Sequence, residues 1–153
     1  MHRLELKVPP LIVVAVTVGL MALTAWLAPM KPWHFTDATS LAWTLVVTGG
    51  LVALAGVSAF RRARTTVNPM HPDTSSTLVT SGIYRYTRNP MYLGFLLILA
   101  GYGVWLANLP ALLWLIGYVL YLTRFQIIPE ERWLSQKFGA DFQYYRERVR
   151  RWF

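Results

Sequence analysis

The sequence predicts an all-α integral membrane protein, a bundle of about four transmembrane helices with a C-terminal amphipathic helix at the membrane interface. Of its 153 residues, 55% are hydrophobic, and the mean hydropathy is +0.38. This composition is too apolar for an ordinary soluble domain, and the length suits a single domain, residues 1–153. Uncharged stretches near these positions are each long enough to cross a bilayer once: 8–28, 41–60, 90–107 and 110–128.

The first two spans are bounded by basic residues. Residues 8–28 exceed the apolar region of roughly 7–15 residues that is typical of a signal peptide, so we expect a retained helix. Residues 41–60 are followed directly by arginines and a long loop, 61–89. Small residues in the second span predict close packing against a neighbouring helix: Gly49, Gly50, Ala53 and Gly56.

The uncharged run from 89 to 123 must fold back on itself, because one helix of that length would measure roughly 50 Å. Asn108-Leu109-Pro110 marks the break, since Asn tolerates turn geometry and Pro suits the first turn of a helix. A tight hairpin brings its two ends together. We therefore expect the Arg88 and Asn89 region to face Arg124, Glu130 and Glu131 at one membrane surface.

The chain changes character after the last span. Pro129 is predicted to begin a helix, residues 129–153, with Glu130 and Glu131 in a first turn that favours acids. An interruption is expected near Gly139. Apolar residues recur there at helical spacing, which indicates an amphipathic interfacial helix: Trp133, Leu134, Phe138, Phe142 and Tyr145.

The charge distribution predicts the orientation. Of fifteen Lys and Arg residues, only Lys31 falls on one side of the four-span arrangement, so we expect both termini and the functional site in the cytoplasm. The net charge of +8 is explained by anionic lipid headgroups, and we expect no nucleic-acid partner. The chain has no Cys, and His2, His34 and His71 lack ligand spacing, so no metal site is predicted.

Two clusters of polar residues flank the hairpin. At the start of the third span, residues 88–92 read Arg-Asn-Pro-Met-Tyr, and a helix N-terminus next to Arg88 favours an anionic guest such as a carboxylate. The alternative is a cytoplasmic Arg followed by an ordinary helix cap. Glu130 and Glu131 suit a cationic amine or a ribose hydroxyl, although two acids at a solvated helix start have the same pattern.

Several segments taken together resemble the isoprenylcysteine carboxyl methyltransferase family. They are Thr77–Tyr84, Arg88–Gly94 and Glu130-Glu131, followed by Phe138-Gly139 and Tyr145. Phospholipid methyltransferases look similar over the same half of the chain. The resemblance implies an integral membrane methyltransferase that binds S-adenosylmethionine between the last two spans and the C-terminal helix, without a Rossmann domain.

The resemblance, together with the two polar clusters, gives a predicted cofactor site. Family contacts match the stretch 76–79, Tyr84, residues 89–92 and Glu130, while Arg88 and Glu131 come from the residue-level argument. The full predicted set is Ser76, Thr77, Leu78, Val79, Tyr84, Arg88, Asn89, Pro90, Met91, Tyr92, Glu130 and Glu131.

The predicted acceptor is a lipophilic small molecule or lipid-linked group, oriented by Arg124, Gln126 and Tyr121. The family typically has His in place of Asn89 and Arg in place of Gln126. Carboxylate, thiol, amine and phenol acceptors therefore all remain open, as does the oligomeric state. The alternative functions are a non-catalytic membrane scaffold and an NADPH-dependent membrane reductase related to sterol reductases.

Overall fold

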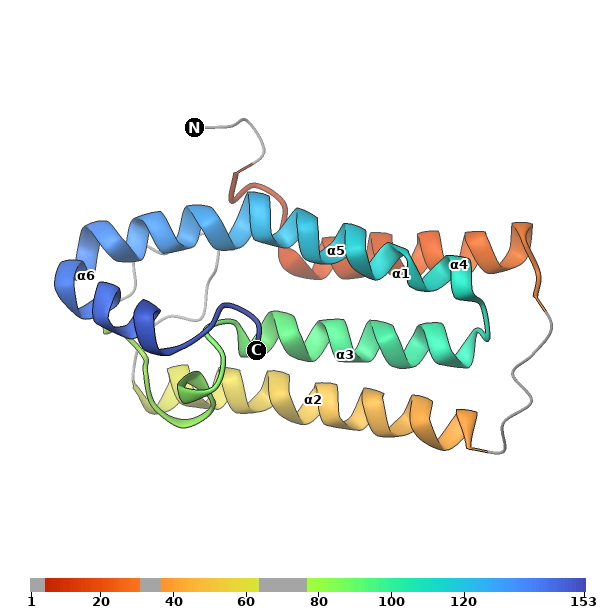
Figure 1. The fold of residues 1–153 in the computed structure, drawn as a ribbon, viewed down its shortest axis with the longest axis horizontal. Coiled ribbons are helices and arrows are strands. Elements are labelled where there is room, and N and C mark those ends of the chain that lie inside the picture. Colours follow the sequence, from red (N-terminus) through yellow and green to blue (C-terminus); the bar gives the residue numbers. More distant parts are fainter. Residues whose placement is uncertain (1–4, 31–36, 64–76) are drawn as a thin grey trace.

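The computed structural model describes residues 5–30, 37–63 and 77–153, and the regular structure within them is entirely helical (Figure 1). The helices are α1 Pro10–Leu27, α2 Ala38–Arg62, η2 Gly82–Arg85, α3 Pro90–Trp105, α4 Leu109–Leu112, α5 Trp114–Leu122, the π-helical η3 Thr123–Ile127 and α6 Ile128–Arg148. The predicted all-α fold is confirmed. Lys31 and Ser76 lie outside the described residues.

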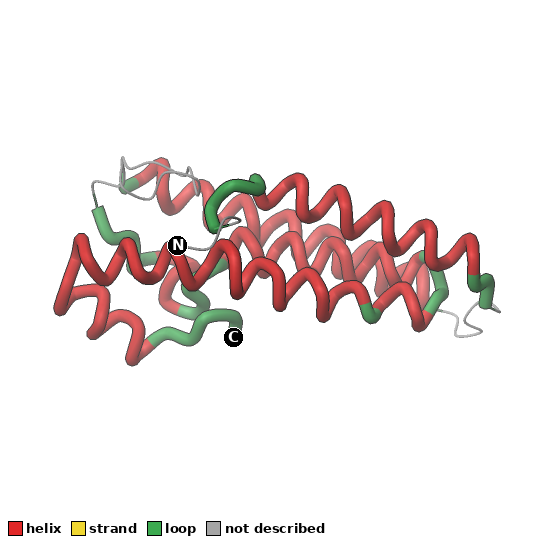
Figure 2. Tube along the Cα trace, turned by 90° about the horizontal axis from the view of Figure 1, so that it is seen from above, coloured by secondary structure: helices red, strands yellow, loops and turns green. Residues whose placement is uncertain are grey.

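Four apolar helical segments form the bundle and run side by side in both views (Figures 1 and 2). Three are long and apolar enough to cross a membrane: α1, α2 and the continuous run Leu109–Arg148. The fourth, α3, is a shorter apolar helix. Each of the four predicted spans overlaps one of these segments, although α2 and the run Leu109–Arg148 extend beyond the predicted 41–60 and 110–128, and the arrangement is that of a membrane protein.

Helices α2 and α3 approach each other closely at glycines of both helices. A Cβ added to Gly49 would lie 2.5 Å from the carbonyl oxygen of Gly94, and one added to Gly94 would lie 2.5 Å from that of Gly49. Gly56 faces Met91 in the same way, with a Cβ-to-Cγ distance of 2.9 Å, whereas Gly50 has nothing within 4 Å. The small residues of α2 therefore bring the start of α3 close, as predicted, and Gly50 takes no part.

The hairpin break occurs where the sequence predicts it. Ala107 has a positive φ of 49°, and the Asn108 side chain accepts a hydrogen bond of 2.9 Å from the backbone N–H of Ala111. The Asn108 amide also donates to the Ala28 carbonyl at 2.7 Å. One buried Asn thus caps the returning helix and anchors the end of α1.

Helix α6 begins at Ile128, one residue before the predicted start at Pro129, but it continues the path of the helices before it. Ile127 has helical dihedral angles, φ −69° and ψ −47°, so α5, η3 and α6 form one continuous path. Pro129 is tolerated because the π-helical turn that precedes it changes the hydrogen-bonding register. Glu130 and Glu131 therefore do not lie at a free helix N-terminus, and the dipole argument for them does not apply.

Helix α6 extends beyond the bundle and then turns back (Figures 1 and 2). The turn is at Gly139, with φ 50° and ψ −119°, where an interruption is predicted. The returning half packs on the loop before α3, in a cluster formed by Val79, Tyr84, Phe142, Tyr145 and Val149. The reversal carries the C-terminal residues back to the start of α3.

Candidate functional site

The two ends of the hairpin meet through their polar side chains. The Arg88 guanidinium donates from Nη2 to Oε1 of Glu131 at 2.8 Å, and the Tyr92 hydroxyl donates to Oε1 of Glu130 at 2.8 Å. The predicted approach of the Arg88 region to Glu130 and Glu131 is confirmed, but Arg124 does not join them and pairs with Glu5. Their adjacent positions on α6 point the two acids at different partners, because successive helical residues differ by about 100°.

Glu130 is held in a network of neutral donors. Its Oε1 accepts from the hydroxyl of Tyr92 and from Nε2 of Gln126, the latter at 3.0 Å. Tyr92 is itself fixed from α5, since the Tyr118 hydroxyl donates to the Tyr92 carbonyl at 3.1 Å. Desolvation raises the pKa of Glu130 to about 7, and the charge of Glu131 adds to it, while the two hydrogen bonds lower it. A carboxylate that titrates near neutral pH suits a cationic partner.

Removing the Tyr92 hydroxyl should raise this pKa further. We expect Tyr92→Phe to move the Glu130 titration upward by about one pH unit, because a hydrogen bond to the ionised form is lost. Infrared spectroscopy of the carboxyl band across a pH series measures this, and the band missing from Glu130→Gln assigns it. An unchanged or lower midpoint would contradict the network.

Glu131 is shared between two arginines. Arg151 contacts it from Nη2 to Oε2 at 2.6 Å and from Nε to Oε1 at 3.1 Å, the oxygen that also accepts from Arg88. The other terminal nitrogen of Arg88, Nη1, donates to the carbonyls of Arg146 and Val149, at 2.9 and 3.1 Å. Among the described residues, Nε of Arg88 is buried without a hydrogen-bond partner. A buried unpaired donor on a cation is an expected place for a missing acceptor.

The Asn89 side chain does not cap α3, contrary to the helix-cap alternative. Its Nδ2 donates instead to the carbonyl of Arg151 at 2.9 Å, and the Thr87 hydroxyl donates to the same carbonyl at 3.3 Å. Asn89 is therefore tied to the C-terminal segment, and its side chain lies beside the Arg88–Glu131 pair.

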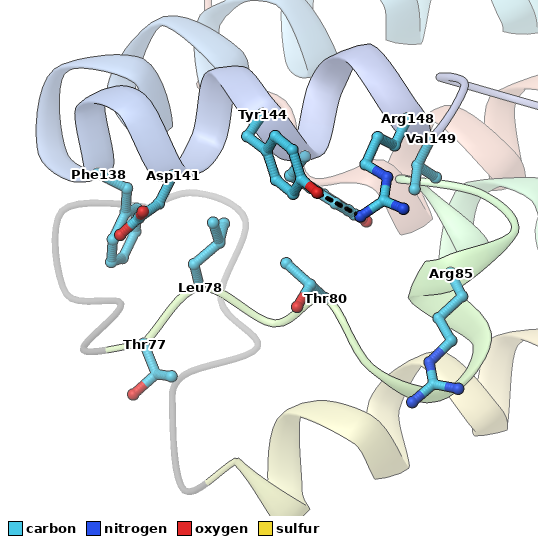
Figure 3. A pocket seen from close by; sticks show the side chains of 10 residues that line it. Thr77, Leu78, Thr80, Arg85, Phe138, Asp141, Tyr144, Arg148 and Val149 are labelled. Carbon is cyan, nitrogen blue, oxygen red and sulfur yellow. Dashed lines mark hydrogen bonds between the residues drawn. The ribbon is translucent and has the colours of Figure 1, made fainter.

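Figure 3 shows a cavity of about 890 Å³ at this end of the molecule. It lies between the loop before α3 and the returning half of α6, and it is lined by Thr77, Leu78, Thr80, Arg85, Phe138, Asp141, Tyr144, Tyr145, Arg148 and Val149. Val149 connects it to the cluster, because its carbonyl accepts from Arg88. Tyr145, another lining residue, donates from its hydroxyl to the Tyr84 carbonyl at 2.8 Å and so fixes this wall of the cavity to the loop before α3. The volume is within the range of small-molecule sites.

The predicted cofactor residues are divided among three places. Thr77 and Leu78 line the cavity, and Val79 and Tyr84 are buried in the packed cluster beside it. Pro90 and Met91 face Gly56 of α2, so their side chains point away from the polar cluster. The polar cluster itself contains Arg88, Asn89, Tyr92, Glu130 and Glu131.

The three predicted acceptor residues do not gather at one point. Gln126 is 2% exposed and joins Glu130. Arg124 instead pairs with Glu5 at 2.9 Å, and the ring of Tyr121 packs on Phe125 with centroids 4.9 Å apart. Together with a second arginine, Arg132, Arg124 lowers the pKa of Glu5 to about 2.

Sequence reasoning missed Arg151, Tyr118 and the site role of Tyr145. No local pattern separates Arg151 from its basic neighbours, and its place depends on the reversal at Gly139. Tyr118 lies in an otherwise apolar span, and nothing in the sequence indicates a partner for its hydroxyl. A helical projection through η3 would also misplace Gln126, because the π-helical turn adds a residue.

A comparison with family models shows to which protein family the chain belongs. The model of the family described as phospholipid methyltransferase matches residues 38–141. The chain belongs to this family. The resemblance predicted from the sequence is confirmed, and the family is one of methyltransferases.

Relatives of this phospholipid methyltransferase family member include plant enzymes and a short bacterial protein. A probable protein-S-isoprenylcysteine O-methyltransferase of Oryza sativa subsp. indica is 32% identical over 123 residues, 78% of this chain and 62% of the rice protein. Protein-S-isoprenylcysteine O-methyltransferase A of Arabidopsis thaliana is 32% identical over 69% of this chain and 53% of its own length. An uncharacterized protein of Haemophilus influenzae is 45% identical over 62 residues, which are 40% of this chain and 98% of that protein. The match thus spans little more than half of the named plant relatives.

Proposed function

We propose that this protein is an S-adenosylmethionine-dependent methyltransferase that acts on a lipophilic acceptor within the membrane. The observation that carries the proposal is the meeting of Glu130, held by Tyr92 and Gln126, with the Arg88–Glu131 pair at one end of the bundle. This arrangement offers a carboxylate and a cation side by side. Family membership and the names of the relatives support the reaction type.

The residues fit the amino-acid end of the cofactor. Arg88 has a buried Nε without a partner, which suits the cofactor carboxylate. Glu130 suits the ammonium group, and its pKa of about 7 leaves it ionised at slightly basic pH. The adjoining cavity, with the rings of Phe138 and Tyr145, suits the nucleoside. One charged cluster and one aromatic cavity therefore match the two ends of a zwitterionic nucleoside.

When bound, S-adenosylmethionine supplies an activated methyl group on its sulfonium. The protein then has to orient the acceptor and exclude water. Gln126 is engaged by Glu130 and carries no charge, so it cannot neutralise an acceptor carboxylate as an Arg would. Arg124, two residues earlier, is the nearest cation on the same helix segment and is already paired with Glu5. The acceptor classes suggested by the relatives are an isoprenylated cysteine and a phospholipid.

Ligand binding in detergent tests the cofactor. We expect S-adenosylhomocysteine to raise the thermal unfolding temperature, since a ligand at 100 times its Kd stabilises a protein by about 2.7 kcal/mol. NADPH at the same concentration should leave that temperature unchanged. A rise with NADPH alone would support the reductase, and a rise with neither would support the scaffold.

The acceptor is identified by a separate experiment. Labelled S-adenosylmethionine is supplied with a panel of farnesylated cysteine, an aminophospholipid, a lipophilic thiol and a lipophilic phenol. Transfer to one of these, absent in the Glu130→Gln variant, identifies the acceptor class. Cofactor binding without transfer to any member would place the acceptor outside these classes.

A further inference from the structure

The C-terminal residues 149–153, which we call the tail segment, run back along the start of α3. The backbone N–H of Arg88 donates to the Arg150 carbonyl at 3.0 Å, and the Arg151 carbonyl accepts from both Thr87 and Asn89. The indole of Trp152 donates to the Thr123 hydroxyl at 3.3 Å. The tail segment therefore connects the residues before α3 to the π-helical turn.

The side chain of Arg151 adds charge at the same place. Its two-nitrogen contact with Glu131 leaves the carboxylate shared between Arg151 and Arg88. Two guanidinium groups and one carboxylate give a cluster with net charge of +1. Without Arg151, the charge of Glu131 would balance that of Arg88, and the cluster would have no net charge. It would then lose its preference for an anion.

We infer that Arg151 is a positioning residue for the cofactor carboxylate, acting through Glu131 and Arg88. This inference rests on the proposed function. Arg151 contacts both oxygens of Glu131 and shares Oε1 with Arg88, so the carboxylate charge is divided between two guanidinium groups and Arg88 keeps positive charge available for the ligand. Its carbonyl also sets the orientation of the Asn89 amide. The side chains of Arg151 and Glu131 are 34% and 12% exposed, so their interaction is partly shielded from solvent.

The matched variants are Arg151→Gln and Arg150→Gln. Both remove one positive charge from the tail segment, but the Arg150 side chain is exposed and only its carbonyl takes part in the contacts described above. The ligands are S-adenosylhomocysteine and its decarboxylated analogue, which keeps the nucleoside and the amine. Titration calorimetry in detergent gives Kd for each pair.

The expected result is selective. Arg151→Gln should raise the Kd of S-adenosylhomocysteine about tenfold and leave the Kd of the analogue within about twofold of the wild-type value. Arg150→Gln should change neither Kd. Equal losses for both ligands would mean a merely structural role, and unchanged Kd values would mean no role; either overturns the inference. Wild-type protein that binds neither ligand would instead refute the proposed function.

Arg151→Lys keeps the test decisive if Arg151→Gln does not fold. Lys retains the charge but makes a single contact, so S-adenosylhomocysteine should bind within about threefold of wild type. A tenfold loss for both ligands in this variant would overturn the inference.

Discussion

Glu130→Gln should weaken S-adenosylhomocysteine binding by about 10- to 100-fold, because a hydrogen bond to a charged partner contributes about 1.5–3 kcal/mol. Gln retains the shape and can still accept from Tyr92, so the loss reports the missing charge. Titration calorimetry in detergent measures it. Glu147→Gln is the control, since Glu147 is an exposed acid on the same helix, contacted by Gln143.

The pH dependence sharpens this prediction. With a pKa of about 7, Glu130 is mostly ionised at pH 8 and mostly protonated at pH 6, so wild-type affinity should fall about tenfold between them. The Glu130→Gln variant should show no such fall. Equal affinities of wild type and variant at pH 8 would contradict the assigned role.

The unfolding temperature of Glu130→Gln distinguishes a loss of ligand binding from a loss of folding. The folded-state pKa of Glu130 is raised above the ordinary value of 4.5, so its ionised form opposes folding at pH above 7. This penalty disappears as the pH falls through 7 toward 4.5. Glu130→Gln should therefore unfold at a temperature no lower than wild type at pH 8, even though it binds the ligand weakly.

The hairpin and the meeting of its ends follow from the sequence. The uncharged run is too long for one crossing, and Asn108 supplies both a turn and a cap, so Arg88 and Glu131 have to approach. These are consequences of length and local chemistry. They require no knowledge of how the remaining helices pack.

What the sequence could not predict depends on tertiary contacts. Pro129 followed by two acids has the pattern of a free helix start, yet a π-helical turn joins it to α5, and Glu130 is held by Tyr92 of another helix. Asn89 has the pattern of a cap, but the carbonyl of Arg151, more than sixty residues away, takes its amide. At Asn89 a distant partner thus replaces the local hydrogen bond that the pattern predicts.

Gly49→Val should force apart the two helices that pack most closely in the bundle. Its Cβ would lie 2.5 Å from the Gly94 carbonyl oxygen and 3.0 Å from the backbone nitrogen of Ile98, and backbone atoms cannot rotate away. Helices α2 and α3 must then separate, at a cost of about 3 kcal/mol or more.

Gly50→Val provides the matched control for this change. It has the same effect on helix propensity, but a Cβ at Gly50 meets nothing within 4 Å, so any difference between the two variants reports the contact with α3. Thermal unfolding in detergent measures both. Since α3 begins with the residues that meet Glu130 and Glu131, Gly49→Val should also abolish S-adenosylhomocysteine binding, whereas Gly50→Val should retain it. Similar unfolding temperatures for the two variants would show that the close approach of α2 and α3 does not hold the site together.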